Sequence, residues 1–582
     1  MISGMLSIVV AWFILAGLLI GLGAAVSRVT LAAPRSGLSA PFWIGWAVWI
    51  AILQLLHMKI ALGTPWVLAL LAGLGCLGLW WNRSSLSETL RESLCERRLF
   101  LAGAAILGVW LCNRGLGPLL SIDAGLYHLG SIKWASEAPL IEGLGNLHGR
   151  LAFNSTAFLW MSSLDRWPSI LRGFNVASGL LLMTAIVQVS HRVLVEPEAA
   201  RNSPAATHFH SRIFHSILLL PLLYAAAVMH VSSTSPDWIV LILGVVLASE
   251  LVALCSREAD DEDEPSGHFL TIAALCAVGI TVKLSFAPLG AMALAVAALR
   301  AAHPEVIRTD LPRTLGPGLL LALLLLVPWS LRSIELSGYP AYPTTFAGID
   351  VAWKVPEERV EAEVRWIRSW ARAPGKSPDE VLGNADWMLP WLANRLRASD
   401  SIALLVFPAV LVALGTLGAA RRRSGASTTT ATLLVPYAVA VLIWFVSAPD
   451  PRFLGSSLWV CAGAMLARAT RHEASLDRTG SARRIANGAS ALCAIGFLVF
   501  IAYMGSTVAG AKGPFISAGP LHGRYPLRNV EMKSFQTDSG LILQVPLHGD
   551  RCWEAALPCT PYPAPRLRLR NEHAPFGGFE LK

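Results

Sequence analysis

Long apolar runs separated by short polar segments dominate the sequence. Most are about 17–25 residues long, enough for a helix to cross a hydrocarbon core of about 30 Å. Backbone groups in lipid must satisfy their own hydrogen bonds, so such runs predict helices. The stretch 152–164 is too short to cross easily and predicts a re-entrant or interfacial helix. We therefore expect an all-α polytopic membrane protein with about 14 transmembrane helices (12–14), near 6–26, 41–62, 65–81, 99–115, 171–193, 213–231, 237–255, 268–285, 286–301, 315–332, 401–419, 431–447, 452–468 and 485–506.

Composition supports this interpretation. Of the 582 residues, 54% are hydrophobic and only 15% are charged, whereas soluble proteins carry roughly 25% charged residues. The net charge is +9, but the basic residues lie in short loops beside the apolar runs. They form no basic stripe with interleaved aromatic residues, so the expected partner is the membrane and not nucleic acid.

Arginine-rich loops alternate with arginine-poor ones along the chain, and the segment 300–313 is one of the rich ones. The positive-inside rule assigns the rich loops to the cytoplasm. The opposite face then carries two large outer loops, 116–170 and 333–400. We expect a multi-pass protein of a bacterial inner membrane, with a transmembrane domain over 1–506 and a small periplasmic C-terminal cap over 507–582.

Cysteine placement agrees with this orientation. Cys552 and Cys559 bracket the segment CWEAALPC in the tail, and the other seven of the nine cysteines are scattered singly. A disulfide between the two is plausible only on an oxidising side of the membrane. Neither a Cys-x-x-Cys motif nor a zinc-binding pattern occurs.

The first large outer loop opens with three groups that could carry chemistry. If 123–136 is helical, Asp123 and Tyr127 lie one turn apart with His128 beside them. A carboxylate near the membrane surface, in a loop packed on apolar spans, suits a general base. The alternative is that Asp123 only caps the helix that follows it.

The same loop carries Arg150 and Asn154 within the segment GLGNLHGRLAFNS. Arg150 could bind an anionic group, and Asn154 could fix a hydroxyl group. The alternative is a glycine-permitted turn that carries an ordinary surface arginine.

Two further candidates lie at the outer ends of spans. Asp237, in SSTSPDW, is either a carboxylate that faces the same compartment as Asp123 or a first-turn acid of its helix. Lys283, in GITVKLSFAP, lies at a depth where an unpaired charge costs roughly 3 kcal/mol or more. Snorkelling to the interface is one solution, and binding a phosphate is the one that we favour.

The last candidates are three charged residues near outer span ends. Arg332 emerges after the Pro-Trp pair of VPWSLRS, and Asp450 and Arg452 lie in the turn SAPDPRF between two spans. Arginine is suited to bidentate binding of phosphate. The alternative for Asp450 and Arg452 is a structural pair at a helix start.

These ionisable residues all fall on one side of the membrane, and their cations could hold a phosphorylated lipid head group. At this point the sequence resembles the GT-C superfamily of membrane glycosyltransferases. It looks most like a bacterial branch with the motifs D-x-G-L-Y-H, GLGNLHGRLAFNS, PW-x-x-R-S, SGYP-x-YP and APDPRF. Here the first motif is Asp123 to His128 and the last includes Asp450, Arg452 and Phe453.

The resemblance implies a GT-C-like fold and a specific reaction. Such enzymes transfer a sugar from a polyprenyl-phosphate carrier to an acceptor on the outer side of the membrane, with inversion at the anomeric carbon. The role of the acidic base maps onto Asp123, with His128 assisting the acceptor or the leaving group. Lys283, Arg332 and Arg452 would stabilise the phosphate charge. The acceptor would be a glycan, a lipid or a protein of the cell envelope.

The sequence departs from the common GT-C pattern in two ways. Many relatives carry a paired acidic motif in the first outer loop, whereas Ala124 and Gly125 follow Asp123 here. This puts a mechanism that uses a bound divalent metal in doubt, although such a metal stays possible. About four predicted spans also precede the loop, which in relatives follows the first span directly.

Two other functions share much of this pattern. A ligase or polymerase of lipid-linked oligosaccharides would need the same outer site and phosphate-binding cations. A transporter or flippase for a lipid-linked glycan would instead place charges deep in the spans and break helices near the midplane. The predicted span centres are largely uncharged, which favours the transferase.

Overall fold

The computed structural model describes most of the chain: residues 2–31, 37–96, 98–119, 121–167, 171–194, 205–228, 230–255, 265–301, 311–421, 428–476, 495, 499, 529–571 and 577–582. The described part is mostly helical, as the apolar runs predict. Its longer helices are α1 (Ile2–Thr30), α2 (Ser39–His57), α3 (Pro65–Trp81), α4 (Arg83–Glu96), α5 (Arg98–Gly115), α9 (Gly173–Leu194), α11 (Ala205–Ala227), α12 (Pro236–Cys255), α13 (Pro265–Val282), α14 (Ala287–Ala301), α15 (Leu311–Ser337), α16 (Glu357–Arg372), α20 (Phe407–Arg421), α21 (Thr428–Ser447) and α22 (Ser457–Leu476).

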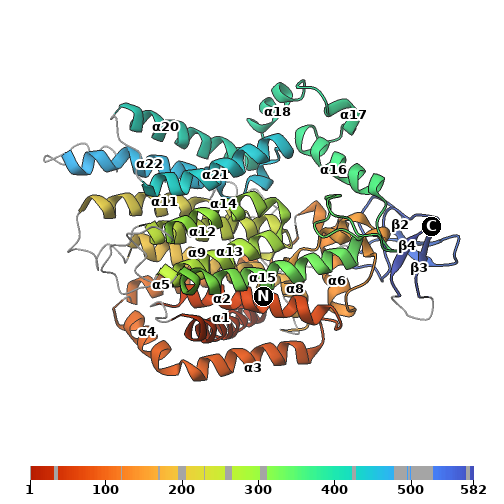
Figure 1. The fold of residues 1–582 in the computed structure, drawn as a ribbon, viewed down its shortest axis with the longest axis horizontal. Helices are drawn as coiled ribbons and strands as arrows, with labels where there is room; N and C mark the ends of the chain where they lie inside the picture. Colours follow the sequence, from red (N-terminus) through yellow and green to blue (C-terminus); the bar gives the residue numbers. More distant parts are fainter. Residues whose placement is uncertain are drawn as a thin grey trace.

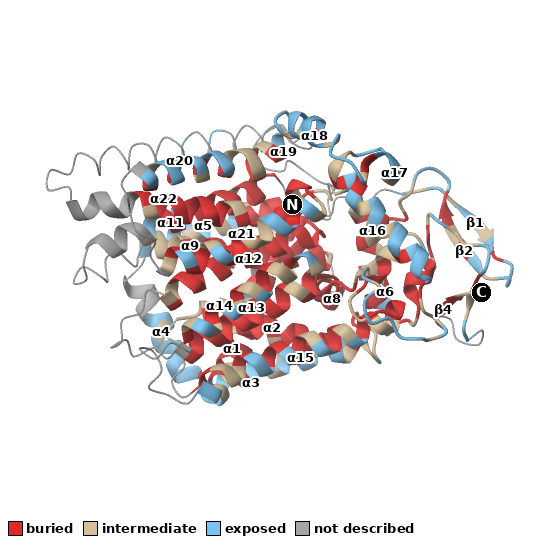
Figure 2. Cartoon of the chain, turned by 45° about the horizontal axis from the view of Figure 1, so that its top comes forward, coloured by how far each residue is buried: buried red, intermediate tan, exposed pale blue. Residues whose placement is uncertain are grey.

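Apart from α4 and α16, which lie at opposite ends, these helices pack side by side into one bundle (Figure 1). Helix α1 packs against both α2 and α3, and α13 joins α2, α12, α14 and α15 at the centre. Glycines permit the closest approach, because a Cβ on Gly23 or Gly45 would overlap the backbone of the facing helix. The centre is continuously buried and apolar, whereas the outward faces of α3 and α15 expose large aliphatic side chains (Figure 2).

Exposed apolar faces on long helices are typical of a membrane protein. In the described part of the chain, eight helices are long and apolar enough to cross a membrane: Ile2–Thr30, Ser39–His57, Gly173–Leu194, Pro236–Cys255, Leu284–Ala301, Leu311–Ser337, Ser399–Ala420 and Thr429–Ser447. The pair Pro65–Trp81 and Arg83–Arg91, which is bent by 76°, would be a ninth if it forms one span. The protein is thus a membrane-embedded helical protein.

We expect about 14 spans, which is more than the eight helices that are long and apolar enough in the described residues. Three of the other expected spans are shorter apolar helices, Ser211–Ala227, Ser266–Val282 and Ser457–Ala469. The run 99–115 is helical as α5, but it is not among the eight, and its ends carry the polar residues Arg98, Asn113 and Arg114. The expected span 485–506 lies outside the described residues, apart from residues 495 and 499. The figure of about 14 (12–14) therefore stays a prediction.

The first outer loop folds into short helices that pack on one end of the bundle (Figure 1). The stretch 152–164, expected as a re-entrant or interfacial helix, forms the end of η2 and a short, fully buried helix that packs against α2, α6 and α9. The elements of this loop are η1 (Ala124–His128), α6 (Leu129–Glu137), α7 (Leu144–Leu147), η2 (Gly149–Phe153) and α8 (Thr156–Ser163).

The second outer loop and the C-terminal segment lie at the same end as α6 (Figure 1). The second loop contains α16 and the short helices α17 (Pro378–Val381), α18 (Met388–Arg395) and α19 (Ser399–Ser401), and the π-helical turn η5 (Ile402–Val406) leads into α20. Three 3-10 turns complete the helical elements: η3 (His230–Ser232), η4 (Leu284–Phe286) and η6 (Pro451–Leu454).

The described part of the C-terminal cap contains two small antiparallel sheets. Strand β1 (Met532–Gln536) pairs with β2 (Ile542–Pro546), and β3 (Leu567–Leu569) pairs with β4 (Phe579–Leu581). The expected disulfide between Cys552 and Cys559 is present. The cap packs on the first loop, since Phe579 and Leu567 share a buried apolar cluster with Trp134 and Leu144.

Candidate functional site: an ionic cluster at one end of the bundle

Asp123 lies between two arginines from distant parts of the chain. Its Oδ1 is 3.6 Å from Nη1 of Arg150, and its Oδ2 is 3.5 Å from Nη1 of Arg452. The residue precedes the π-helical turn η1, a rare geometry that is frequent at functional sites. Its side chain makes no capping hydrogen bond, so the capping alternative does not describe it.

Asp450 holds Arg452 in place from the turn before α22. Its Oδ1 accepts hydrogen bonds from the backbone N–H of Arg452 at 3.0 Å and from its Nε at 3.2 Å. The other oxygen lies 3.5 Å from Nη2 of Arg395. The structural pair considered for Asp450 and Arg452 is therefore present, and it leaves Nη1 of Arg452 directed to Asp123.

Lys283 forms an ion pair with Asp237, so snorkelling to the interface is not what compensates its charge. Helix α13 ends just before it, and the extended backbone at Lys283 leads into η4. Its ammonium group bonds the carboxylate of Asp237 and lies 3.9 Å from the centroid of the Phe453 ring. Asp237 sits in the first turn of α12, where Ser235 Oγ donates to its Oδ2 at 3.2 Å.

The half-buried Tyr127 and the buried His128 form the wall beside this pair. Their rings pack edge to face, and Nδ1 of His128 lies 3.0 Å from Oγ1 of Thr234. Burial lowers the pKa of His128 to about 4, against the opposing effect of Asp123 and Asp237. Burial, reinforced by Asp123, raises the pKa of Tyr127 well above its ordinary value. Both groups are neutral near pH 7 and can exchange hydrogen bonds with a bound hydroxyl group.

Arg150 connects the cluster to the second outer loop. Its Nε donates to Oε1 of Glu363 on α16 at 2.8 Å, while Nη1 faces Asp123. Burial alone would lower the pKa of Arg150, but Glu363, Tyr127 and Asp123 raise it above its ordinary value. The guanidinium therefore stays charged and does not behave as an ordinary surface arginine.

Asn154 and Arg332 belong to a neighbouring buried network. Nε of Arg332 donates to Oδ1 of Asn154 at 3.2 Å, and Nη1 lies 2.6 Å from Nδ1 of His57. Asn154 adopts a left-handed backbone conformation and exchanges two hydrogen bonds with Trp329. Both side chains are buried, so these contacts fix α15 against the loop. The role of Arg332 as a phosphate ligand stays a prediction.

The charges of the cluster balance among the described residues. Four carboxylates, Asp123, Asp237, Asp450 and Glu363, face four cations, Arg150, Lys283, Arg395 and Arg452. The contacts of Asp123 are the longest that hold Arg150 or Arg452. An incoming anion would therefore compete more easily with Asp123 than with Glu363 or Asp450 for these two guanidinium groups.

The C-terminal cap closes over the loop that carries Asp123. The backbone N–H of Trp553 donates to the carbonyl of Gly125 at 3.0 Å, and a Cβ on Gly125 would lie 2.5 Å from Cε2 of that indole. The disulfide Cys552–Cys559 encloses Trp553 in a short loop. Glycine is thus required at 125 by the close approach of the cap.

Sequence reasoning did not identify Glu363, Arg395 or Thr234 as members of the site. The strongly amphipathic pattern of α16 marks a surface helix, but nothing in it says which partner Glu363 meets. Within the described ranges, no group of three or more His, Cys, Asp or Glu side chains could hold a metal ion.

Comparison with known proteins gives one match. No curated protein and no solved structure matches the chain. The model of a family described as "Domain of unknown function (DUF8201)" matches residues 5–459. This range covers most of the 582 residues and includes every member of the ionic cluster. The chain therefore belongs to the DUF8201 family.

Proposed function

We propose that the protein is a GT-C-type glycosyltransferase. It moves a sugar from a polyprenyl-phosphate carrier to a cell-envelope acceptor on the periplasmic face of a bacterial inner membrane. The observation that carries this proposal is the convergence of Asp123, Arg150 and Arg452, joined by Lys283 across the Phe453 ring, beside an apolar helix bundle. Such a site suits a substrate with a hydrocarbon tail and a charged head.

The proposed reaction forms one bond at the anomeric carbon and breaks another. The acceptor hydroxyl oxygen attacks the anomeric carbon. The bond between this carbon and the phosphate oxygen breaks as polyprenyl phosphate leaves. Asp123 takes the hydroxyl proton or orients the hydroxyl group. Lys283 and Arg452 stabilise the charge on the departing phosphate, and His128 hydrogen-bonds the acceptor or the leaving group.

The balanced charges suggest how donor binding prepares the base. A donor phosphate that takes Nη1 of Arg452 replaces its 3.5 Å contact with Asp123. Asp123 then keeps only Arg150 as a described cation partner, and its Oδ2 is free to accept a hydrogen bond from the acceptor hydroxyl group. Asp450 still holds Nε of Arg452, so the guanidinium keeps its position during this exchange.

Release of polyprenyl phosphate tests the proposal. The purified protein would be incubated with a panel of polyprenyl-phosphate hexoses and pentoses together with a crude envelope fraction as acceptor. We expect release with at least one donor, and a loss of about 10²–10⁴-fold in Asp123→Asn, the range for general-base catalysis. Asp550→Asn is the matched control, because this exposed carboxylate pairs with Arg551 on the cap.

Two outcomes would contradict the proposal. One is the absence of release with every donor. The other is equal release by Asp123→Asn and the parent. A lipid-linked oligosaccharide ligase would give a different result in this assay, because it would release polyprenyl phosphate or diphosphate only from oligosaccharide donors.

A further inference from the structure

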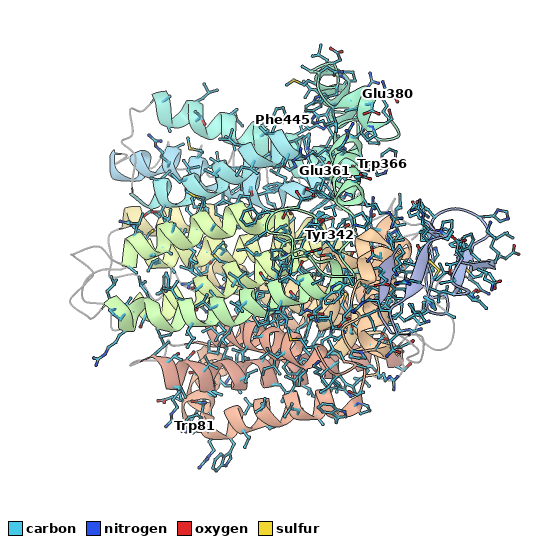
Figure 3. All side chains as sticks on the ribbon, turned by 45° about the vertical axis from the view of Figure 1, so that its right-hand side comes forward. Trp81, Tyr342, Glu361, Trp366, Glu380 and Phe445 are labelled. Carbon is cyan, nitrogen blue, oxygen red and sulfur yellow. A yellow bond between two sulfur atoms is a disulfide. The ribbon has the colours of Figure 1, made fainter. Side chains whose placement is uncertain are left out.

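A groove lies beside the ionic cluster, between α16, the first outer loop and the cap. Its volume is about 660 Å³, and residues from all three parts line it, among them Asn146, His148, Tyr342, Glu363, Trp366 and Tyr562. Figure 3 labels Tyr342, Glu361 and Trp366, which border it from the second outer loop. Sites for small organic ligands have volumes of about 300–1,000 Å³, so the groove is large enough for a ligand of several rings.

Aromatic faces are the first feature of its lining. Trp366 is 44% exposed and Tyr562 is 56% exposed. Tyr562 also stacks on the His148 ring, with centroids 5.6 Å apart and an interplanar angle of 12°. Exposed, flat and amphipathic rings offer a large contact area to the faces of sugar rings at little conformational cost.

Unpartnered buried polar atoms are the second feature. In the part of the chain that the structure describes, Nδ1 of His148 and Oδ1 of Asn146 are buried and lack a hydrogen-bond partner. A buried polar atom without a partner costs about 1–3 kcal/mol, but both atoms are enclosed, so a ligand in the groove would bond them only after the side chains rotate. Burial lowers the pKa of His148 to about 3, so the ring that borders the groove is neutral near pH 7.

The charge of the lining is the third feature. Four carboxylates and two guanidinium groups border the groove: Glu358, Glu361, Glu363, Asp379, Arg359 and Arg365. Carboxylates accept hydrogen bonds from hydroxyl and amino groups but repel phosphate and carboxylate ligands. The lining therefore favours neutral or amino-bearing ligands over anionic ones.

We propose that this groove binds the acceptor as a neutral or amino-bearing oligosaccharide. Glu363 joins the groove to the cluster, because Arg150 bonds Glu363 and faces Asp123. The guanidinium group of Arg150 thus separates a saccharide at Glu363 from Asp123. This inference rests on the proposed transferase function for the term acceptor, but the binding itself needs no donor.

Direct binding tests it with a matched pair of tryptophans. Trp366 lines the groove, whereas Trp370, on the same helix and 43% exposed, is not among the lining residues. The full-length protein in lipid nanodiscs would be titrated calorimetrically with cello-, malto- and chito-oligosaccharides of two to six units. Oligogalacturonate and a lysine-rich peptide would serve as the anionic and the peptidic probe.

We expect a neutral or amino-sugar oligosaccharide to bind, and Trp366→Ala to weaken its Kd about fivefold to tenfold. Trp370→Ala should leave Kd unchanged, and Tyr562→Ala should repeat the effect of Trp366→Ala on the opposite wall. The proposal is overturned if no neutral or amino-sugar probe binds, if only oligogalacturonate or the peptide binds, or if both tryptophan variants behave alike. Release of polyprenyl phosphate without saccharide binding would reject the groove alone, and binding without release would reject the transferase alone.

Discussion

Replacing Asp237 with asparagine would leave the Lys283 ammonium group against the Phe453 ring, with no described carboxylate bonded to it. The side chain of Asp237 is 8% exposed and that of Lys283 is 26% exposed. Breaking a fully buried ion pair costs about 3–5 kcal/mol, whereas an exposed pair contributes about 0–1 kcal/mol. Since Lys283 keeps some contact with solvent, we expect a loss of about 2–3 kcal/mol in the free energy of unfolding.

A double-mutant cycle measures this coupling without assuming the value of either single change. Apparent Tm would be recorded in detergent at one fixed scan rate, because large membrane proteins often unfold irreversibly. We expect Asp237→Asn and Lys283→Met each to lower Tm by several degrees. The double variant should be more stable than either single one, since it leaves no uncompensated charge.

Strictly additive losses in this cycle would refute the reasoning, because they would mean that the two side chains do not interact in the folded protein. The same variants separate stability from function. The double variant should regain stability but not donor binding, because the methionine carries no charge for a phosphate.

The cap, the buried imidazole and the buried guanidinium give three further tests. Gly125→Val should undock Trp553, seen as faster proteolysis of the cap than in Gly130→Ala; equal rates would contradict the docking. Apparent Tm should fall between pH 6.5 and about 4, because the unfolded chain protonates His128 at a higher pH than the folded one; an unchanged slope in His128→Gln would argue against this. Arg332→Lys should lower Tm because its fork of hydrogen bonds is lost, whereas a change in KM alone would favour the phosphate role.

The apolar runs were sufficient to predict the helices and their gathering into a membrane bundle. Hydrophobic burial and backbone satisfaction act locally along each run, so a single sequence reveals them. The arginine pattern also predicted that the two large outer loops and the tail lie on the same side of the membrane. The described parts of these segments lie at one end of the bundle. Cys552 and Cys559, the disulfide candidate in the tail, do form a disulfide.

The pairing within the site was beyond sequence reasoning. Asp123 meets Arg452 only because helices far apart in the chain pack together, and no local pattern encodes that contact. The partners Glu363 and Arg395 lie on surface helices of the second outer loop, where a charged residue usually faces only water. Arg332, expected among the other cations, instead bonds Asn154 and His57 in a buried network.

The most direct test of the account is a structure of the protein, determined by electron cryomicroscopy, with polyprenyl phosphate bound. The central claim is that the cations of the cluster hold the donor phosphate. We predict the phosphate within hydrogen-bonding distance of Lys283 and Arg452, with Asp123 released from Arg452. A phosphate bound away from both cations, or an unchanged contact between Asp123 and Arg452 in the occupied protein, would contradict the claim.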